Sequence, residues 1–141
     1  MTVRVLTASD AGDCIQLYRD LTVGPSPTDE KLFSKVIQHP GTQVYGKVVD
    51  GCVVAMATLH ILPNVTWGGR PYALVENVVT AAKHRGNGFG RETLEAARDA
   101  AWAQDCYKIM LLTGQGRNAT GFYESVGFSR DNKFGMIIRR D

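Results

Sequence analysis

The feature of this sequence that most restricts its fold is a glycine-rich segment at residues 83–91, KHRGNGFGR. It follows a run at 72–80 that is rich in β-branched residues and predicts a strand. It precedes a run at 90–104 that is rich in Ala, Leu, Glu and Arg and predicts a helix. Glycines at alternate positions allow a sharp turn and let backbone amides approach a ligand without obstruction by Cβ atoms. A strand, a glycine-rich turn and a helix in this order indicate a mixed α/β fold.

The glycine-rich segment also predicts an anion-binding site. Amides at a helix start, together with the positive end of the helix dipole, attract a pyrophosphate, and Lys83, Arg85 and Arg91 add positive charge. The spacing matches neither the GxxxxGK[ST] loop nor the GxGxxG dinucleotide fingerprint. A turn of this kind can also serve only to close a sharp corner, so the spacing alone leaves both interpretations open.

The first forty residues predict a strand followed by two helices. Residues 2–6 alternate in polarity as a short strand does, and Ser9-Asp10 offers a cap for the first helix. Thr28 offers a cap for the second helix, which His39-Pro40-Gly41 should end.

A hairpin follows. Residues 42–49 and 52–62 are rich in β-branched residues and predict two strands. Asp50-Gly51 between them is a dipeptide that readily accepts the positive φ values of a tight hairpin turn. We therefore expect these two strands to pair antiparallel.

The last third of the chain predicts three further elements. Residues 107–113 have the pattern of a buried strand, which should pair parallel with the strand before the glycine-rich turn. Residues 118–126 predict a short helix with a polar cap, and 134–139 predict a last strand. No internal repeat or linker divides the chain, so we expect a single domain over 1–141.

Composition narrows the classes of function. A net charge of +2 and a charged fraction of 21% provide no basic stripe for nucleic acid, and no apolar run reaches the length of a membrane span. The 3 cysteines are widely spaced beside apolar residues, which predicts core thiols in a reducing compartment. The first residues do not resemble a signal peptide, so we expect a cytoplasmic protein. We expect no metal site, because no His, Cys, Asp and Glu residues have metal-ligand spacing, and His39 and His60 show no partner pattern.

The sequence resembles the GCN5-related N-acetyltransferase (GNAT) family in two motifs that occur in the family's order. One is the family's Gln or Arg, two residues, Gly, one residue, then Gly or Ala; the other is a downstream Asn followed by Phe-Tyr-x-x-x-Gly-Phe. The resemblance covers nearly the whole chain. The matching residues are Arg85, Gly88 and Gly90 in the first motif and Asn118, Phe122, Tyr123, Gly127 and Phe128 in the second.

This resemblance implies the acyl-CoA N-acyltransferase fold, with a central twisted, mostly antiparallel sheet flanked by helices. Its parallel middle strands splay apart to admit acetyl-CoA. The implied activity is direct acetyl transfer from acetyl-CoA to a primary amine of a small molecule, in a ternary complex and without a metal. The implied partners are acetyl-CoA, the amine and a second copy of the chain in a homodimer, with no nucleic acid or membrane.

Two narrower alternatives remain open. Residues 75–79, VENVV, together with 106–109 and Arg139-Arg140, resemble the glucosamine-6-phosphate N-acetyltransferases. However, Asn77 stands where those enzymes usually have an acidic residue, and an acidic residue expected near Leu111 is missing. The other alternative is a sensor that binds acyl-CoA without turnover.

The resemblance also assigns candidate roles. Tyr123 is the candidate general acid, since a phenol with a pKa of about 10 can protonate a departing thiolate with a pKa of about 8.5. Glu76 is the candidate general base for the amine, and the Val78 amide is a candidate oxyanion donor. Packing for Tyr123, a helix cap for Asn118 and solvent exposure for Glu76 are the structural alternatives. The cofactor-binding candidates are Val78, Val79, Thr80, Arg85, Gly86, Asn87, Gly88, Phe89, Gly90, Arg91, Asn118 and Tyr123.

Overall fold

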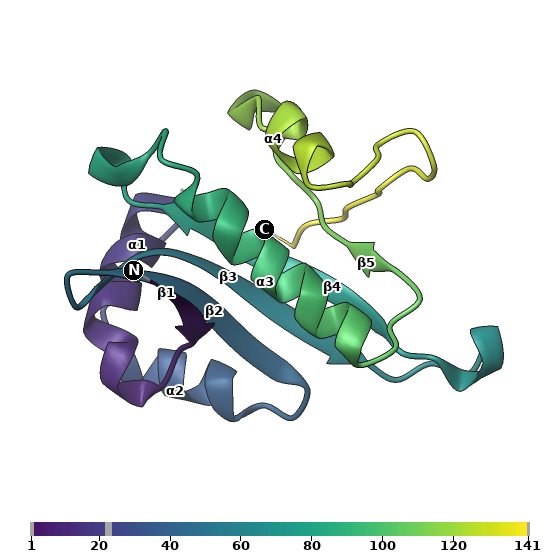
Figure 1. Ribbon diagram of the computed structural model, residues 1–141, viewed down its shortest axis with the longest axis horizontal. Coiled ribbons are helices and arrows are strands. Elements are labelled where there is room, and N and C mark those ends of the chain that lie inside the picture. Colours follow the sequence, from purple (N-terminus) through teal and green to yellow (C-terminus); the bar gives the residue numbers. More distant parts are fainter. Residues whose placement is uncertain (1, 22–23, 141) are drawn as a thin grey trace. The chain divides into compact units, whose positions relative to one another are not determined.

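The computed structural model describes residues 2–21 and 24–140. Within these residues the strands form one sheet in the order β1-β2-β3-β4-β5 (Figure 1), and every neighbouring pair is antiparallel except β4 and β5, which are parallel. This confirms the predicted mixed, mostly antiparallel sheet. The strands are β1 Thr2–Val5, β2 Thr42–Val49, β3 Cys52–Leu62, β4 Tyr72–Thr80 and β5 Ile109–Met110.

Helices α1 and α2 pack on one face of the sheet and α3 packs on the other (Figure 1). In the described part of the chain, no helix is long and apolar enough to cross a membrane. The helices are α1 Ala11–Leu21, α2 Glu30–Gln38, α3 Phe89–Ala103 and α4 Thr120–Ser125. Short 3-10 turns cover Ala8–Asp10, Trp67–Gly69, Ala82–His84 and Gln115–Arg117.

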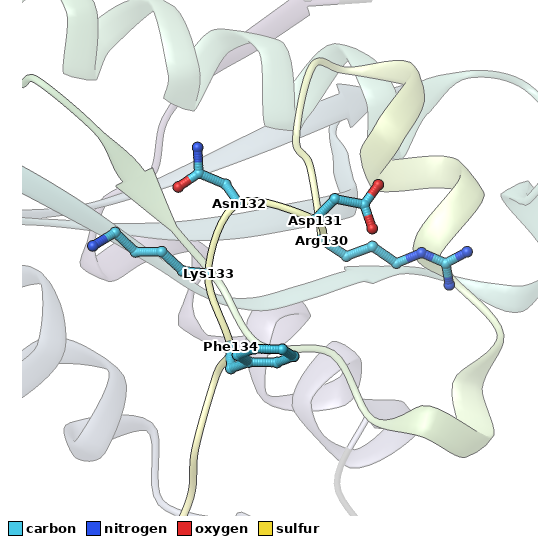
Figure 2. Close-up of a pocket in the computed structure, with 5 residues that line it drawn as sticks. All are labelled: Arg130, Asp131, Asn132, Lys133 and Phe134. Carbon is cyan, nitrogen blue, oxygen red and sulfur yellow. The ribbon is translucent and has the colours of Figure 1, made fainter.

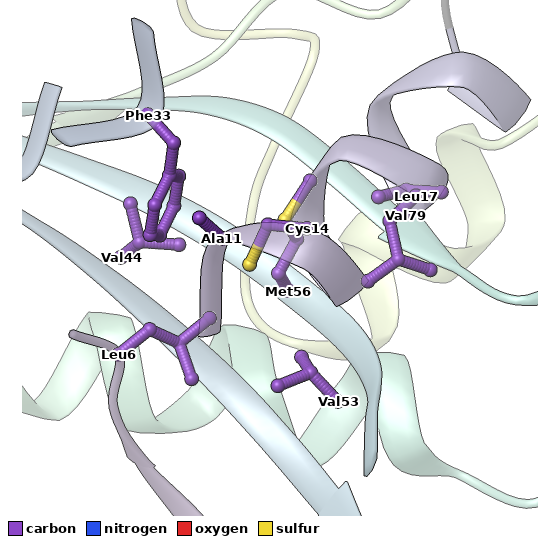
Figure 3. Close-up of a cluster of buried hydrophobic side chains, with 9 residues drawn as sticks. All are labelled: Leu6, Ala11, Cys14, Leu17, Phe33, Val44, Val53, Met56 and Val79. Carbon is purple, nitrogen blue, oxygen red and sulfur yellow. The ribbon is translucent and has the colours of Figure 1, made fainter. Parts of the chain in front are cut away.

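A cluster of buried apolar side chains joins α1 and α2 to the sheet (Figure 3). Burying a side chain such as that of Phe33, which is 1% exposed, contributes about 2 kcal/mol. On the opposite face, α3 buries Leu94, Ala97 and Ala101 at helical spacing. The cluster under α1 and α2 consists of Leu6, Ala11, Cys14, Leu17, Phe33, Val44, Val53, Met56 and Val79. Cys52 is exposed, so the expectation that every cysteine lies in the core is wrong for that residue.

The predicted hairpin is confirmed. Asp50 and Gly51 have φ values of 50° and 79°, the left-handed values that a primed two-residue turn requires. A β-bulge between Lys47 and Val48 then shifts the pairing of β2 with β3. The shift places Thr42 directly opposite His60.

Both helix caps differ from the prediction by one or two residues. The turn before α1 begins after Thr7, whose amide donates to the Asp10 carboxylate at 2.8 Å. The cap of α2 is Asp29 and not Thr28, because the Asp29 carboxylate accepts from the Lys31 amide at 2.9 Å. In both places a nearby carboxylate satisfies an amide that the helix leaves without a partner.

The chain divides into two compact units, residues up to Leu111 and residues from Leu112 onward. The predicted strand at 107–113 is only Ile109–Met110, and Met110 is 37% exposed, so the prediction of a buried strand is wrong in length and burial. The cap of α4 is Ala119 and not Asn118, which has a left-handed φ of 53°.

The predicted last strand, 134–139, does not form. Phe134, Met136 and Ile138 are 98%, 91% and 97% exposed. The apolar pattern makes the segment suited to a strand, but a strand also needs a neighbouring edge to satisfy its backbone groups, and no strand pairs with these residues in the described chain.

Candidate functional site

The first part of the site is an open edge of β4. The parallel pairing of β4 with β5 covers only Ala73 with Ile109 and Leu74 with Met110. β4 continues to Thr80, and no other described strand pairs with it on this side. The strand therefore leaves backbone donors and acceptors along this edge, as the predicted splaying of the middle strands requires.

A β-bulge at Asn77 sets the direction of this edge. Met56 pairs with Val79 but Thr58 pairs with Glu76, so β4 has one extra residue opposite β3. Asn77 has a φ of 53°, a conformation that Asn adopts more readily than most residues. This conformation suits Asn or Asp, so the backbone alone does not explain why Asn stands where the resemblance leads us to expect an acidic residue.

Beyond the bulge, hydrogen bonds show which peptide groups face outward. The Ala81 amide donates to the Val54 carbonyl of β3 at 2.8 Å, whereas the Thr80 carbonyl accepts from Arg85 Nε at 3.2 Å. Because successive residues of a strand direct their peptide groups to opposite edges, Val78 shares the open edge with Thr80. The Val79 side chain is buried in the core.

The second part of the site is the glycine-rich turn between β4 and α3. Gly86 and Gly88 have φ values of 81° and 79°, and a Cβ atom built on either would meet nothing within 4 Å. Gly88 is the cap residue of α3, and no side chain caps the helix there. The first amides of α3 therefore have no helical partner and face an exposed turn, while Asn87 Nδ2 steadies the turn by donating to the His84 carbonyl at 3.0 Å.

Two cations near this turn form ion pairs. Arg91 Nε contacts the Glu95 carboxylate at 2.6 Å, one helical turn along. Lys47 on β2 is 5% exposed and forms an ion pair with Glu92 in the first turn of α3. Its ammonium also lies 5.2 Å from the centre of the Phe89 ring. Lys47 is not among the residues predicted from the sequence, although a lysine inside an apolar strand was an available signal.

A third group of polar side chains lies on the face of the sheet that α1 and α2 cover. Glu76 is exposed and pairs across the strands with Thr58. The buried Thr42 hydroxyl lies 2.7 Å from His60 Nδ1 and 3.1 Å from His39 Nδ1. The statement that His39 and His60 lack a partner pattern is therefore wrong: the hairpin register and the end of α2 bring them together.

The unit from Leu112 onward contains Tyr123 and Asn118. The half-buried Tyr123 ring packs edge-on against Phe122 at 5.1 Å and Phe128 at 6.1 Å between centroids. These contacts orient the phenol, and its role as an acid stays a prediction. The same unit has a cavity of about 170 Å³. It is lined by the consecutive residues 130–134 (Figure 2), none of which is a predicted site residue.

Comparison with known proteins identifies the family. A family model described as the acetyltransferase (GNAT) family matches residues 13–128. The chain belongs to this acetyltransferase family. It is accordingly an acyltransferase enzyme with the GNAT fold, as the resemblance implied.

Named relatives support the family and differ in acceptor. A glucosamine 6-phosphate N-acetyltransferase from Trypanosoma brucei brucei is 30% identical over 132 residues, 91% of this chain and 88% of that protein. The N-alpha-acetyltransferase RimI of Mycobacterium tuberculosis is 27% identical over 131 residues, 92% of this chain and 79% of that protein. A solved structure of a putative acetyltransferase from Agrobacterium tumefaciens superimposes with a TM-score of 0.93 at 38% identity, covering 99% of this chain and 100% of that one.

Proposed function

We propose that this GNAT acetyltransferase transfers the acetyl group of acetyl-CoA directly to a primary amine of a small molecule in a ternary complex. The observation that carries the proposal is the open edge of β4 that leads into an uncapped helix start. An extended pantetheine arm needs strand-like hydrogen bonds, and the pyrophosphate that follows it needs clustered amides. The chain offers these two features in that order along residues 78–91.

The cofactor contacts follow from this arrangement. Val78 and Thr80 present backbone groups to the pantetheine arm, and Val79 anchors the strand in the core. The turn from Arg85 to Arg91 presents its amides to the pyrophosphate. The remaining loop candidates are Gly86, Asn87, Gly88, Phe89 and Gly90. Asn118 and Tyr123 stay cofactor-binding candidates on the family resemblance.

The chemistry needs one base and one acid. Glu76 removes a proton from the acceptor ammonium, because only the neutral amine has the lone pair that attacks the thioester carbon. The Val78 amide stabilises the resulting oxyanion. As the carbon–sulfur bond breaks, Tyr123 donates a proton to the coenzyme A thiolate. The second proton that the nitrogen loses as the acetamide forms replaces the one that Tyr123 gave. One acetamide, one thiol and one proton are the products.

Glucosamine 6-phosphate is the acceptor that one observation favours, the 30% identity with the trypanosomal enzyme. Asn77 argues against this acceptor, because the left-handed backbone there suits an aspartate as well as an asparagine and so does not account for the missing acidic residue. The relative named N-alpha-acetyltransferase RimI supports instead the alternative that the amine is an N-terminal one.

The proposal includes the organisation of the protein. The family match runs across both compact units, which supports one N-acetyltransferase domain over 1–141.

The exposed apolar run at 134–138 supports a homodimer, since a second copy would cover it. Sedimentation at micromolar concentration should give twice the mass of the chain, and a monomeric mass would refute the dimer. A cytoplasmic location fits the free buried thiols of Cys14 and Cys106.

The test of the activity is the release of free thiol from acetyl-CoA with a panel of amines that includes glucosamine 6-phosphate and a peptide N-terminus. We expect turnover with at least one amine. The Tyr123→Phe variant should then lower kcat by about 100- to 10,000-fold and leave coenzyme A affinity unchanged. Binding of acetyl-CoA without turnover by any amine would favour the sensor, and full kcat in Tyr123→Phe under rate-limiting chemistry would assign the tyrosine to packing.

A further inference from the structure

The Thr42 hydroxyl joins two histidines that lie far apart in the sequence. Thr42 begins β2 and is 5% exposed, His60 belongs to β3, and His39 caps the end of α2. The hydroxyl oxygen lies 2.7 Å from His60 Nδ1 and 3.1 Å from His39 Nδ1. Both distances are those of hydrogen bonds, so one hydroxyl connects a half-buried imidazole to an exposed one.

The chain of hydrogen bonds begins beside Glu76. His60 pairs with Leu74 and Thr58 pairs with Glu76, so the imidazole and the carboxylate are diagonal neighbours on the same face of β3 and β4. Long side chains at such positions are within reach of each other. Burial lowers the pKa of His60, the negative charge of Glu76 opposes this, and the charge of His39 adds to it. The lowered pKa favours the neutral imidazole, which has a vacant nitrogen that can accept a proton.

One assignment of protons satisfies the whole chain. If His60 carries its proton on Nδ1, that proton is donated to Thr42 Oγ1, and the Thr42 hydroxyl donates to His39 Nδ1. His60 Nε2 is then a vacant acceptor, and His39 Nε2–H is the donor at the exposed end. A proton that arrives at His60 Nε2 can thus leave from His39 by transfers along existing hydrogen bonds.

We propose that His60, Thr42 and His39 form a relay that carries the proton of the acceptor amine from Glu76 to solvent while the bound substrates cover the otherwise exposed carboxylate. The relay rests on the proposed function, with Glu76 as the base. Each turnover converts an ammonium and a thioester to an amide, a thiol and one released proton. Glu76 takes that proton and passes it to His60 Nε2, which returns Glu76 to the ionised form needed for the next amine. The transfer leaves His60 protonated on Nε2 and His39 protonated on Nδ1. Exchange of both imidazoles with water to their original tautomers, together with rotation of the Thr42 hydroxyl, restores the starting arrangement.

The three residues act as positioning residues for Glu76, and a purely structural role would have other consequences. A hydrogen-bonded cluster that only fixes the end of α2 to the sheet would affect stability and leave the pH dependence of kcat unchanged. A relay predicts that the hydroxyl of Thr42, and not merely its shape, determines how fast Glu76 is regenerated.

Thr42→Val and Thr42→Ser separate these roles, since valine keeps the shape and serine keeps the hydroxyl. With acetyl-CoA and the best amine of the panel, Thr42→Val should lower kcat about tenfold and change the pH profile of kcat, because the path of the proton is interrupted. Thr42→Ser should restore kcat and the pH profile to within about twofold of the wild type. His39→Gln, at an exposed position, should reproduce the loss if Thr42→Val does not fold. Wild-type kcat and pH profile in folded Thr42→Val and His39→Gln would overturn the relay.

A second measurement does not depend on turnover. Titration of the His60 imidazole by nitrogen NMR should give a lower pKa in Glu76→Gln than in the wild type, because the favourable negative charge is gone. An unchanged His60 pKa would break the first link of the relay. Failure of the proposed function is seen separately, as absence of thiol release by the wild-type protein with every amine.

Discussion

The starts of α2 and α3 differ in how their first amides are satisfied. At α2 the Asp29 carboxylate accepts from the Lys31 amide at 2.9 Å, so the chain closes this helix start with its own side chain. At α3 the cap is Gly88, which has a left-handed φ of 79° and no side chain to offer. A capping side chain usually stabilises a helix start by about 1 kcal/mol, and α3 lacks this stabilisation.

The difference shows what an anion site requires of the chain. A capping carboxylate at Gly88 would occupy the amides and place negative charge where a pyrophosphate must sit. Glycine leaves those amides accessible, and the ion pair of Lys47 with Glu92 attaches the first turn of α3 to β2 instead. Stability at this helix start comes from the sheet beneath it, which leaves the exposed side available for a ligand.

The largest expected effect comes from placing a bulky side chain at Gly88, the uncapped start of α3. Gly88→Val should weaken coenzyme A binding about 10- to 100-fold, because it hinders one or two hydrogen bonds to a charged ligand. Gly69→Val is the matched control: Gly69 has a φ of 78° and, like Gly88, open space at the Cβ position, but lies in the turn before β4. Calorimetric titration should show the loss only in Gly88→Val. Equal affinities in the two folded variants would contradict an amide site at Gly88.

A smaller effect is expected from removing the ion pair between Lys47 and Glu92, which attaches α3 to β2. Lys47→Met should weaken coenzyme A binding about tenfold, since it leaves the Glu92 carboxylate unpaired beside the phosphates. Lys47→Met combined with Glu92→Gln should recover most of the affinity, which makes a double-mutant cycle informative. A double variant no better than Lys47→Met would show that Lys47 acts by packing under Phe89 and not through charge.

At the start of α2, which Asp29 caps, the expected effect is on stability alone. Asp29→Ala should lower the free energy of unfolding by about 1 kcal/mol, because the Lys31 amide loses its partner. Coenzyme A affinity should stay within about twofold of the wild type. Urea unfolding and calorimetry of one preparation measure both quantities, and a large loss of affinity would undermine the distinction between the two helix starts.

The smallest effect is expected at the start of α1, which Asp10 closes. The hydrogen bond from Arg4 lowers the pKa of Asp10 from 3.8 to about 2, and the Thr7 amide acts in the same direction. A carboxyl whose pKa is depressed on folding stabilises the protein above its unfolded pKa and loses that contribution as the pH falls through the folded value. Arg4 is 45% exposed, so we expect less than about 1 kcal/mol. Unfolding of wild type and Asp10→Asn should differ at neutral pH and converge towards about pH 2.

Much of the sheet could be predicted because its signals are local. The turn at Asp50-Gly51 and the β-branched runs on either side define β2 and β3, and β4 ends where the glycines begin. The bulge at Lys47 could not be predicted, since it depends on packing across strands. Without it, Leu59 would lie opposite Thr42, so the pairing of Thr42 with His60 could not be found by counting from the turn.

The C-terminal segment is a part of the chain whose structure could not be predicted from local signals. The apolar residues of 134–138 predict a strand, but the pattern cannot say which edge would pair with it, and no described strand does. The glycine-rich turn could be recognised from its motif, and its role as an anion site stays a prediction. The open edge at Val78 could not be recognised, because it depends on where the pairing with β5 stops. The roles of Glu76 and Tyr123 come from resemblance and remain predictions.

A titration of the wild-type protein with coenzyme A and, separately, with pantetheine tests most directly whether the open start of α3 binds a pyrophosphate. Both ligands carry the pantetheine arm that should lie along β4, and only coenzyme A carries the pyrophosphate. We expect coenzyme A to bind at least about 100-fold more tightly, as several amide hydrogen bonds to a charged group predict. Equal affinities for the two ligands, or no binding of coenzyme A at all, would contradict the site.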